Sequence, residues 1–128
     1  MSYYYARTVS LSFDEAIVRV TETLKAEGFG ILTEIDVKET LKKKLDVDFR
    51  PYRILGACNP PFAYQALQTE NHVGTMLPCN VVVQELPSGE VEIAAVDPVA
   101  SMQAIDNPQL RKIAEEIRQK LRRAVDAV

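Results

Sequence analysis

The stretch 80–86, NVVVQEL, is followed by the tripeptide PSG at 87–89 and then by VEIAAV at 91–96, and this region decides the fold. Two runs rich in β-branched residues that flank a short turn are typical of a β-hairpin, so we expect these strands to pair antiparallel. A doubly wound parallel sheet needs a helix between consecutive strands, and the hairpin breaks that alternation. The sequence therefore favours an α+β domain with a mixed or mostly antiparallel sheet.

Capping signals outside the hairpin predict where the helices begin. Ser12 and Glu15 form a capping box before an apolar stripe with helical spacing, and Gly28 supplies the stop. Asn107 precedes a proline and a second long apolar stripe. The predicted strands cover residues 3–9, 29–35, 80–86 and 91–96, and a further strand lies within 47–57, where Pro51 restricts its start. The predicted helices follow Ser12, Asp36, Asn59 and Asn107. The order is β-α-β-α-β-α-β-β-α, with both long helices expected on one face of a curved five-stranded sheet.

Length and charge restrict the classes of function. A chain of 128 residues has the usual size of one domain, so residues 1–128 are expected to form a single unit. The formal net charge of −3 gives no general attraction to nucleic acid or to anionic membranes. No run approaches the roughly 18 apolar residues that spanning a bilayer requires, and the first residues show no signal pattern. We therefore expect a cytoplasmic protein with neither nucleic acid nor membrane as a partner.

Two cysteine–asparagine steps are the most distinctive short elements. Cys58 ends the third predicted strand, directly before the cap residue Asn59 of a helix that opens on Pro60, and Cys79 begins the fourth strand. If these two strands pair antiparallel, the thiols are neighbours although they are far apart in the sequence. Capping explains Asn59. Asn80 has no cap to make, so it either satisfies backbone groups or presents its amide to a ligand.

Three interpretations of the two cysteines are open. In the first, both are small buried apolar residues, as free cysteines usually are. In the second, a small-molecule pocket is lined by Cys58, Asn59, Cys79 and Asn80. In the third, the thiols bind a metal or take part in a redox reaction. In the redox version Cys58 is the nucleophile and Cys79 the resolving partner, although no Cys-x-x-Cys motif is present.

The metal version needs more ligands than two thiols. His72 is the only histidine and lies on the connection between Cys58 and Cys79, and Asp97 would be a fourth ligand. The simpler interpretation of His72 is an exposed loop residue just past a helix. The sequence contains no phosphate-binding loop and no nucleophile elbow, and it requires no cofactor. It therefore favours a protein that is not an enzyme.

Several segments together resemble the signature of a family described as a domain of unknown function, DUF302. They are IDV at 35–37, ILGACNP at 54–60, AL at 66–67, LPCNVVV at 77–83 and VDP at 96–98. The resemblance covers nearly the whole chain. It implies a compact α+β domain with a largely antiparallel sheet similar to that of the TATA-box-binding protein, and a homodimer. It implies no activity, and a fold shared with a DNA-binding protein does not imply DNA binding.

The sequence thus favours a small cytoplasmic homodimeric binding module with a ligand or metal site near Cys58, Asn59, Cys79 and Asn80. The alternatives are a thiol-dependent redox protein or enzyme that uses Cys58 and Cys79, and a structural or interaction domain without a small-molecule site.

Overall fold

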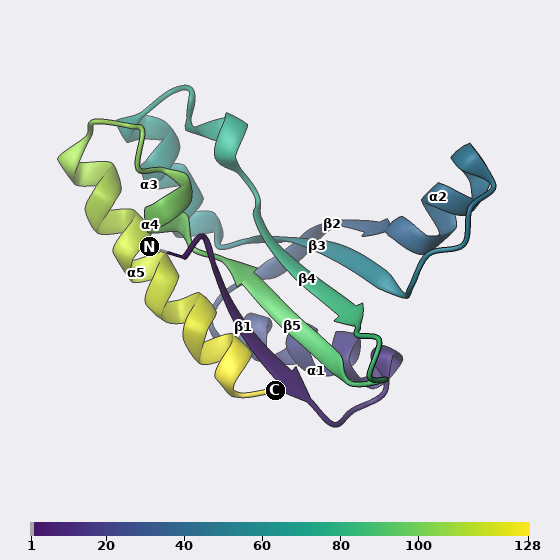
Figure 1. Ribbon diagram of the computed structural model, residues 1–128. Helices are drawn as coiled ribbons and strands as arrows, with labels where there is room; N and C mark the ends of the chain where they lie inside the picture. The colour runs from purple at the N-terminus through teal and green to yellow at the C-terminus, as the bar shows by residue number, and fades with distance from the viewer. Residues whose placement is uncertain (1) are drawn as a thin grey trace.

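A five-stranded antiparallel sheet in the order β1-β5-β4-β3-β2 forms one layer of the computed structural model, which describes residues 2–128 (Figure 1). The strands are β1 (Tyr4–Val9), β2 (Gly30–Asp36), β3 (Tyr52–Cys58), β4 (Cys79–Glu85) and β5 (Val91–Val96). The helices are α1 (Phe13–Ala26), α2 (Val37–Leu45), α3 (Pro60–Thr69), α4 (Pro98–Ser101) and α5 (Pro108–Asp126), with a 3-10 turn η1 (Val73–Met76). The predicted class and element order are confirmed, and every strand pair is antiparallel.

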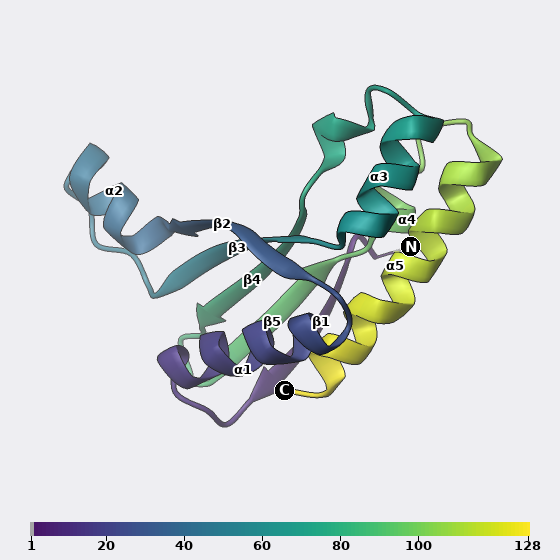
Figure 2. The same cartoon turned by 180° about the vertical axis from the view of Figure 1, so that it is seen from behind.

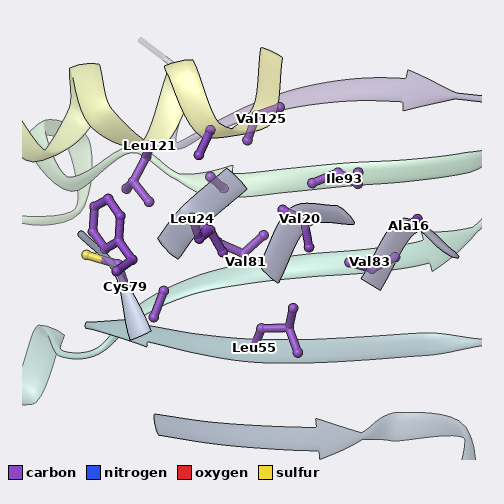
Figure 3. Packing of buried hydrophobic residues seen from close by; sticks show 14 of the residues in the cluster. Ala16, Val20, Leu24, Leu55, Cys79, Val81, Val83, Ile93, Leu121 and Val125 are labelled. Carbon is purple, nitrogen blue, oxygen red and sulfur yellow. The ribbon is translucent and has the colours of Figure 1, made fainter. Parts of the chain in front are cut away.

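The two long helices cover one face of the sheet. Figure 2 shows α1 and α5 on the same side of the strands, and Figure 1 shows the opposite face without a covering helix. The apolar stripes of the two helices meet the inward side chains of the central strands, among them Leu55, Val81 and Ile93 (Figure 3). Successive side chains of a strand point to opposite faces, so each strand contributes alternate residues to this main core.

A second, smaller apolar cluster lies beside the main core. Its buried members are Ala66, Val73, Met102, Leu110 and Ala114. They come from α3, η1, the segment after α4 and the start of α5. The domain therefore has two packed regions, and the N-terminal half of α5 belongs to the second.

The predicted caps of the long helices are confirmed. The Ser12 hydroxyl accepts from the backbone N–H of Glu15, whose side chain in turn accepts from the Ser12 N–H. Gly28 follows α1 with φ of 91°, a left-handed conformation that favours glycine. The Asn107 side chain accepts from the first N–H groups of α5. Local hydrogen bonding thus fixes both ends of α1 and the start of α5.

The third strand occupies the second part of its predicted region. We expected a strand within 47–57 whose start Pro51 restricts, and β3 begins at Tyr52 and ends at Cys58, one residue beyond that region. Asp46 ends α2 in the left-handed conformation, with φ of 53°, and the chain then runs irregularly to Pro51, which has no N–H to give to a ladder. The β-branched residue Val47 lies in this irregular segment and is exposed.

The helix α2 projects from the sheet at the far end of β2 and β3 (Figures 1 and 2). None of its residues is buried, and Leu45 is 66% exposed. Within residues 2–128, no helix is both long enough and apolar enough to cross a membrane.

Candidate functional site

The ends of β3 and β4 lie side by side, as the sequence predicted. Ala57 is paired with Cys79, and Gly56 is paired with Asn80. Burial raises the pKa of the Cys79 thiol from 9.0 to about 11, and the neighbouring Cys58 thiol adds to the rise. The antiparallel register therefore places the two thiols at neighbouring positions of adjacent strands, and both are free cysteines.

A cavity of about 310 Å³ opens beside these thiols. Its walls come from the start of β2, the adjoining ends of β3 and β4, helix α3, the turn η1, the residue after α4, and α5. The residues that line it are Phe29, Leu32, Ala57, Cys58, Asn59, Ala63, Ala66, Leu67, Gly74, Leu77, Pro78, Cys79, Met102, Leu110, Ile113 and Ile117. We call it the thiol cavity. Its volume is at the lower end of the roughly 300–1,000 Å³ that ligand pockets occupy.

The thiol cavity is apolar because of which side chains face it. Asn59 is the only lining residue with a nitrogen or oxygen in its side chain, and the thiols of Cys58 and Cys79 are weak hydrogen-bonding groups. Two alanines of α3, Ala63 and Ala66, face the cavity where longer side chains would fill it. The cavity lies where members of the main core and of the second apolar cluster meet.

Cys79 is the inner of the two thiols. It is 5% exposed and stands in the row of inward side chains that continues through Val81 and Val83 (Figure 3). Cys58 is only half-buried at the last position of β3. The half-buried thiol is thus the one that a reagent from solution meets first.

Asn59 does not act as predicted. It occupies the cap position of α3, but its side chain makes no cap hydrogen bond. Prolines occupy the first two positions of the helix, and neither has an N–H to donate to a capping oxygen. The Asn59 side chain, 8% exposed, instead donates from Nδ2 to the carbonyl of Glu27 at 3.2 Å. It therefore ties the start of α3 to the end of α1.

Asn80 does not line the thiol cavity. Because it follows the inward residue Cys79 in β4, its side chain points to the uncovered face of the sheet, where it is exposed. There it borders a shallow hollow of about 370 Å³ together with Tyr3, Tyr4 and Tyr52. The four predicted site residues are thus divided, with Cys58, Asn59 and Cys79 at the cavity and Asn80 on the opposite face.

The residues named for a metal are not gathered into one site. Among residues 2–128 no group of three His, Cys, Asp or Glu side chains could hold a metal ion. His72 is exposed before η1. Asp97 is 3% exposed and caps α4, and its carboxylate lies 3.7 Å from Arg118 and 3.6 Å from Arg122. The carboxylate of Asp97 therefore already interacts with the N–H groups of α4 and with two guanidinium groups.

The fold and this site define a class, a single α+β domain that encloses an apolar cavity between its sheet and a small helical cluster. The chain belongs to the family described as "Domain of unknown function DUF302", whose profile matches residues 5–128. Among solved structures it is similar to an uncharacterized conserved DUF302 protein from Bacillus stearothermophilus. The two chains share 35% sequence identity with a TM-score of 0.93 over 99% of this chain and 98% of that one. No curated protein matches the chain.

Proposed function

We propose that this protein is a cytoplasmic homodimeric binding module that holds a small, predominantly apolar molecule in the thiol cavity. The observation that carries the proposal is the cavity of about 310 Å³ with Asn59 as its only amide-bearing wall residue. Pockets that bind small molecules combine an apolar lining with few polar groups that orient the ligand. The cytoplasm keeps thiols reduced, which suits two free cysteines at such a site.

The protonation of Cys79 favours an uncharged group at the inner end of the cavity. A thiol whose pKa is about 11 stays protonated at neutral pH, so the inner wall carries a neutral S–H rather than a thiolate. An ion placed against this wall would lose its water without gaining a partner of opposite charge. We therefore expect an apolar portion of the ligand to lie against Cys79.

Binding of a neutral aromatic probe tests this function. Indole is titrated into the isotope-labelled protein and followed by NMR, and the rate at which iodoacetamide alkylates Cys58 is measured with and without the probe. We expect indole to shift signals of the cavity residues and to slow the alkylation.

Two substitutions on the same helix give a matched comparison. Ala63→Phe fills the cavity, whereas Gln68→Phe places the same side chain on the exposed side of α3. We expect Ala63→Phe alone to abolish the indole response. The thermal unfolding midpoint of each variant reports whether it folds. If a folded Ala63→Phe protein binds indole as the unchanged protein does, the cavity is not the binding site.

The homodimer is proposed with the uncovered sheet face as its interface. Tyr4 and Ile35 are 46% and 48% exposed there, and half-buried apolar residues of β3, β4 and β5 lie between their strands. Helix α2, which we call the α2 arm, extends from the same sheet. Its Leu45 is exposed, and none of its residues is buried against the rest of the chain. In a twofold pair, each arm and each face would meet the equivalent surface of the other copy, as a self-complementary interface requires.

Sedimentation equilibrium tests the dimer. We expect Ile35→Glu to shift the protein to a monomer, because it introduces a charge into the proposed interface. Val18→Glu serves as the control, since Val18 is 57% exposed on α1, away from that face. A protein that sediments as a monomer at all micromolar concentrations, or equal behaviour of the two variants, contradicts the proposal.

The adjacency of Cys58 and Cys79 favours one second candidate, a reversible dithiol. Oxidation by a small disulfide would form the Cys58–Cys79 bond, and the two protein thiols would pass two electrons and two protons to the reagent, which is released as two thiols. Mass spectrometry after incubation with oxidised glutathione tests it. Loss of both free thiols without glutathione adducts supports the dithiol, whereas stable adducts or unchanged thiols refute it.

A further inference from the structure

A second cavity adjoins the thiol cavity. Its volume is about 380 Å³, and it lies between the segment that follows α4 and the N-terminal part of α5. Met102 and Leu110 line both cavities, so these two side chains form the wall between them. The two cavities therefore share a boundary at two side chains of the second apolar cluster.

Met102 is the more adaptable of these two shared side chains. It is 6% exposed and lies in the turn between α4 and α5, outside any strand or long helix. Methionine is unbranched and adapts its shape at low energetic cost, so a change of its side-chain torsions can join two neighbouring spaces. The two cavities are thus suited to a ligand longer than either one alone.

The second cavity differs from the first in having a cationic residue. Arg111 and Gln103 line it alongside apolar side chains. Arg111 is exposed, and the ion pairs found within residues 2–128 do not include it. It also lies near the beginning of the long helix α5, where the helix dipole favours negative charge. A guanidinium with this freedom can form two parallel hydrogen bonds to a carboxylate.

We propose that the ligand is a linear amphiphile with one carboxylate, such as a medium-chain fatty acid. Its tail occupies the thiol cavity, the chain passes Met102, and the carboxylate lies against Arg111 with Gln103 as a neighbouring amide. This assignment rests on the proposed binding function of the thiol cavity. An uncharged tail suits the apolar thiol cavity, and a carboxylate suits the second cavity, which Arg111 lines.

Calorimetric titration with decanoate and decanol tests the assignment, because the two probes have the same tail and differ in the head group. We expect the protein to bind decanoate more tightly than decanol. Arg111→Gln should weaken decanoate roughly tenfold, the effect of one hydrogen bond to a charged group, and leave decanol unchanged. Lys112→Gln removes an adjacent exposed charge outside both cavities and should change decanoate affinity by less than about twofold at physiological salt.

A second measurement locates the tail. Decanoate should protect Cys58 from iodoacetamide, whereas butanoate should not, because its chain is too short to reach from Arg111 into the thiol cavity. Ala63→Phe should remove the protection by decanoate.

The failures of the two proposals are distinguishable. If decanol and indole bind and protect Cys58 but decanoate binds no better than decanol, the amphiphile is refuted and the binding function stands. Equal losses in the Arg111 and Lys112 variants also refute the carboxylate site. If no probe protects Cys58 in the folded protein, both proposals fail.

Discussion

The stability of this domain should fall steeply at alkaline pH because of one buried thiol. Cys79 is almost fully buried against apolar side chains, and this burial raises its pKa from 9.0 to about 11, with a further contribution from Cys58. In the unfolded chain the thiol loses its proton above about pH 9, whereas the folded chain keeps it until about pH 11. The unfolded state thus binds fewer protons in this interval, and stability decreases as the pH rises.

The size of the effect follows from the two pKa values. A tenfold change in a proton-binding constant corresponds to about 1.4 kcal/mol, so the rise from 9.0 to about 11 amounts to roughly 3 kcal/mol. This stability is fully present below pH 9 and is lost as the pH rises through 11. It is a large part of the 5–15 kcal/mol that holds a typical domain folded.

Urea denaturation between pH 7.5 and 11 under reducing conditions measures the effect. Lysines and tyrosines titrate over the same interval, so the informative quantity is the difference between the unchanged protein and Cys79→Ala. We expect the stability advantage of the unchanged protein over this variant to shrink by roughly 2 kcal/mol across the range, because at pH 11 the folded thiol is only about half ionised. Cys58→Ala is the control, and it should retain most of the pH dependence. Parallel curves for the unchanged protein and Cys79→Ala would refute the reasoning.

Three further substitutions have defined expected effects. Gly56→Ala should lower the free energy of unfolding by roughly 1–3 kcal/mol, because the new methyl would overlap the Thr33 hydroxyl and approach Pro78 Cγ to 2.7 Å. Asn59→Ala should cost about 1–2 kcal/mol through loss of the hydrogen bond to the Glu27 carbonyl, and it should weaken indole binding. Asp97→Ala should cost about 2–3 kcal/mol, since it removes the cap of α4 and the carboxylate beside two arginines.

Chemical denaturation checks all three, and the Gly56 and Asp97 substitutions each have a matched comparison. Gly30→Ala adds a methyl where nothing lies within 4 Å, so it should change stability by less than about 0.5 kcal/mol. Asp97→Asn keeps an oxygen for the cap and should be less harmful than Asp97→Ala. The steric argument fails if the alanines at 30 and 56 are equally tolerated. Unchanged stability in Asn59→Ala would show that its bond to α1 contributes nothing.

Local signals in the sequence predicted most of the fold. Ser12 and Asn107 satisfy N–H groups of their own helices, so their roles depend on neighbours a few residues away. The hairpin of β4 and β5 is likewise determined by its turn and flanking strands. The side-by-side placement of Cys58 and Cys79 was predictable because it needed only one assumption, an antiparallel pairing of β3 with β4.

The candidate site was predicted only in part, and two of the errors have simple causes. Asn80 was grouped with Cys79, although adjacent residues of a strand point to opposite faces. Asn59 was assigned a capping role, but its side chain donates instead to the Glu27 carbonyl, a partner distant in the sequence. The first error could have been avoided from the sequence, whereas the second depended on a contact between distant elements.

The cavity itself could not have been foreseen. It depends on small side chains such as Ala63 and Ala66 facing Met102 and Ile117 from elements far apart in the chain. Whether such residues leave a space or close it is decided by packing distances between helices, which no local pattern encodes.

The position of the thiol cavity between two apolar clusters has a consequence for how the domain opens. The second cluster joins α3, η1, the turn after α4 and the start of α5. Ile113 packs against both clusters, and the thiol cavity lies beside this junction. This corner is therefore expected to unfold locally before the sheet does. A molecule in the cavity would join the two clusters, and amide hydrogen exchange should slow in α3 and η1 while the rates in the central strands barely change. Binding of a ligand in the thiol cavity would thus make the two clusters unfold together as one cooperative unit.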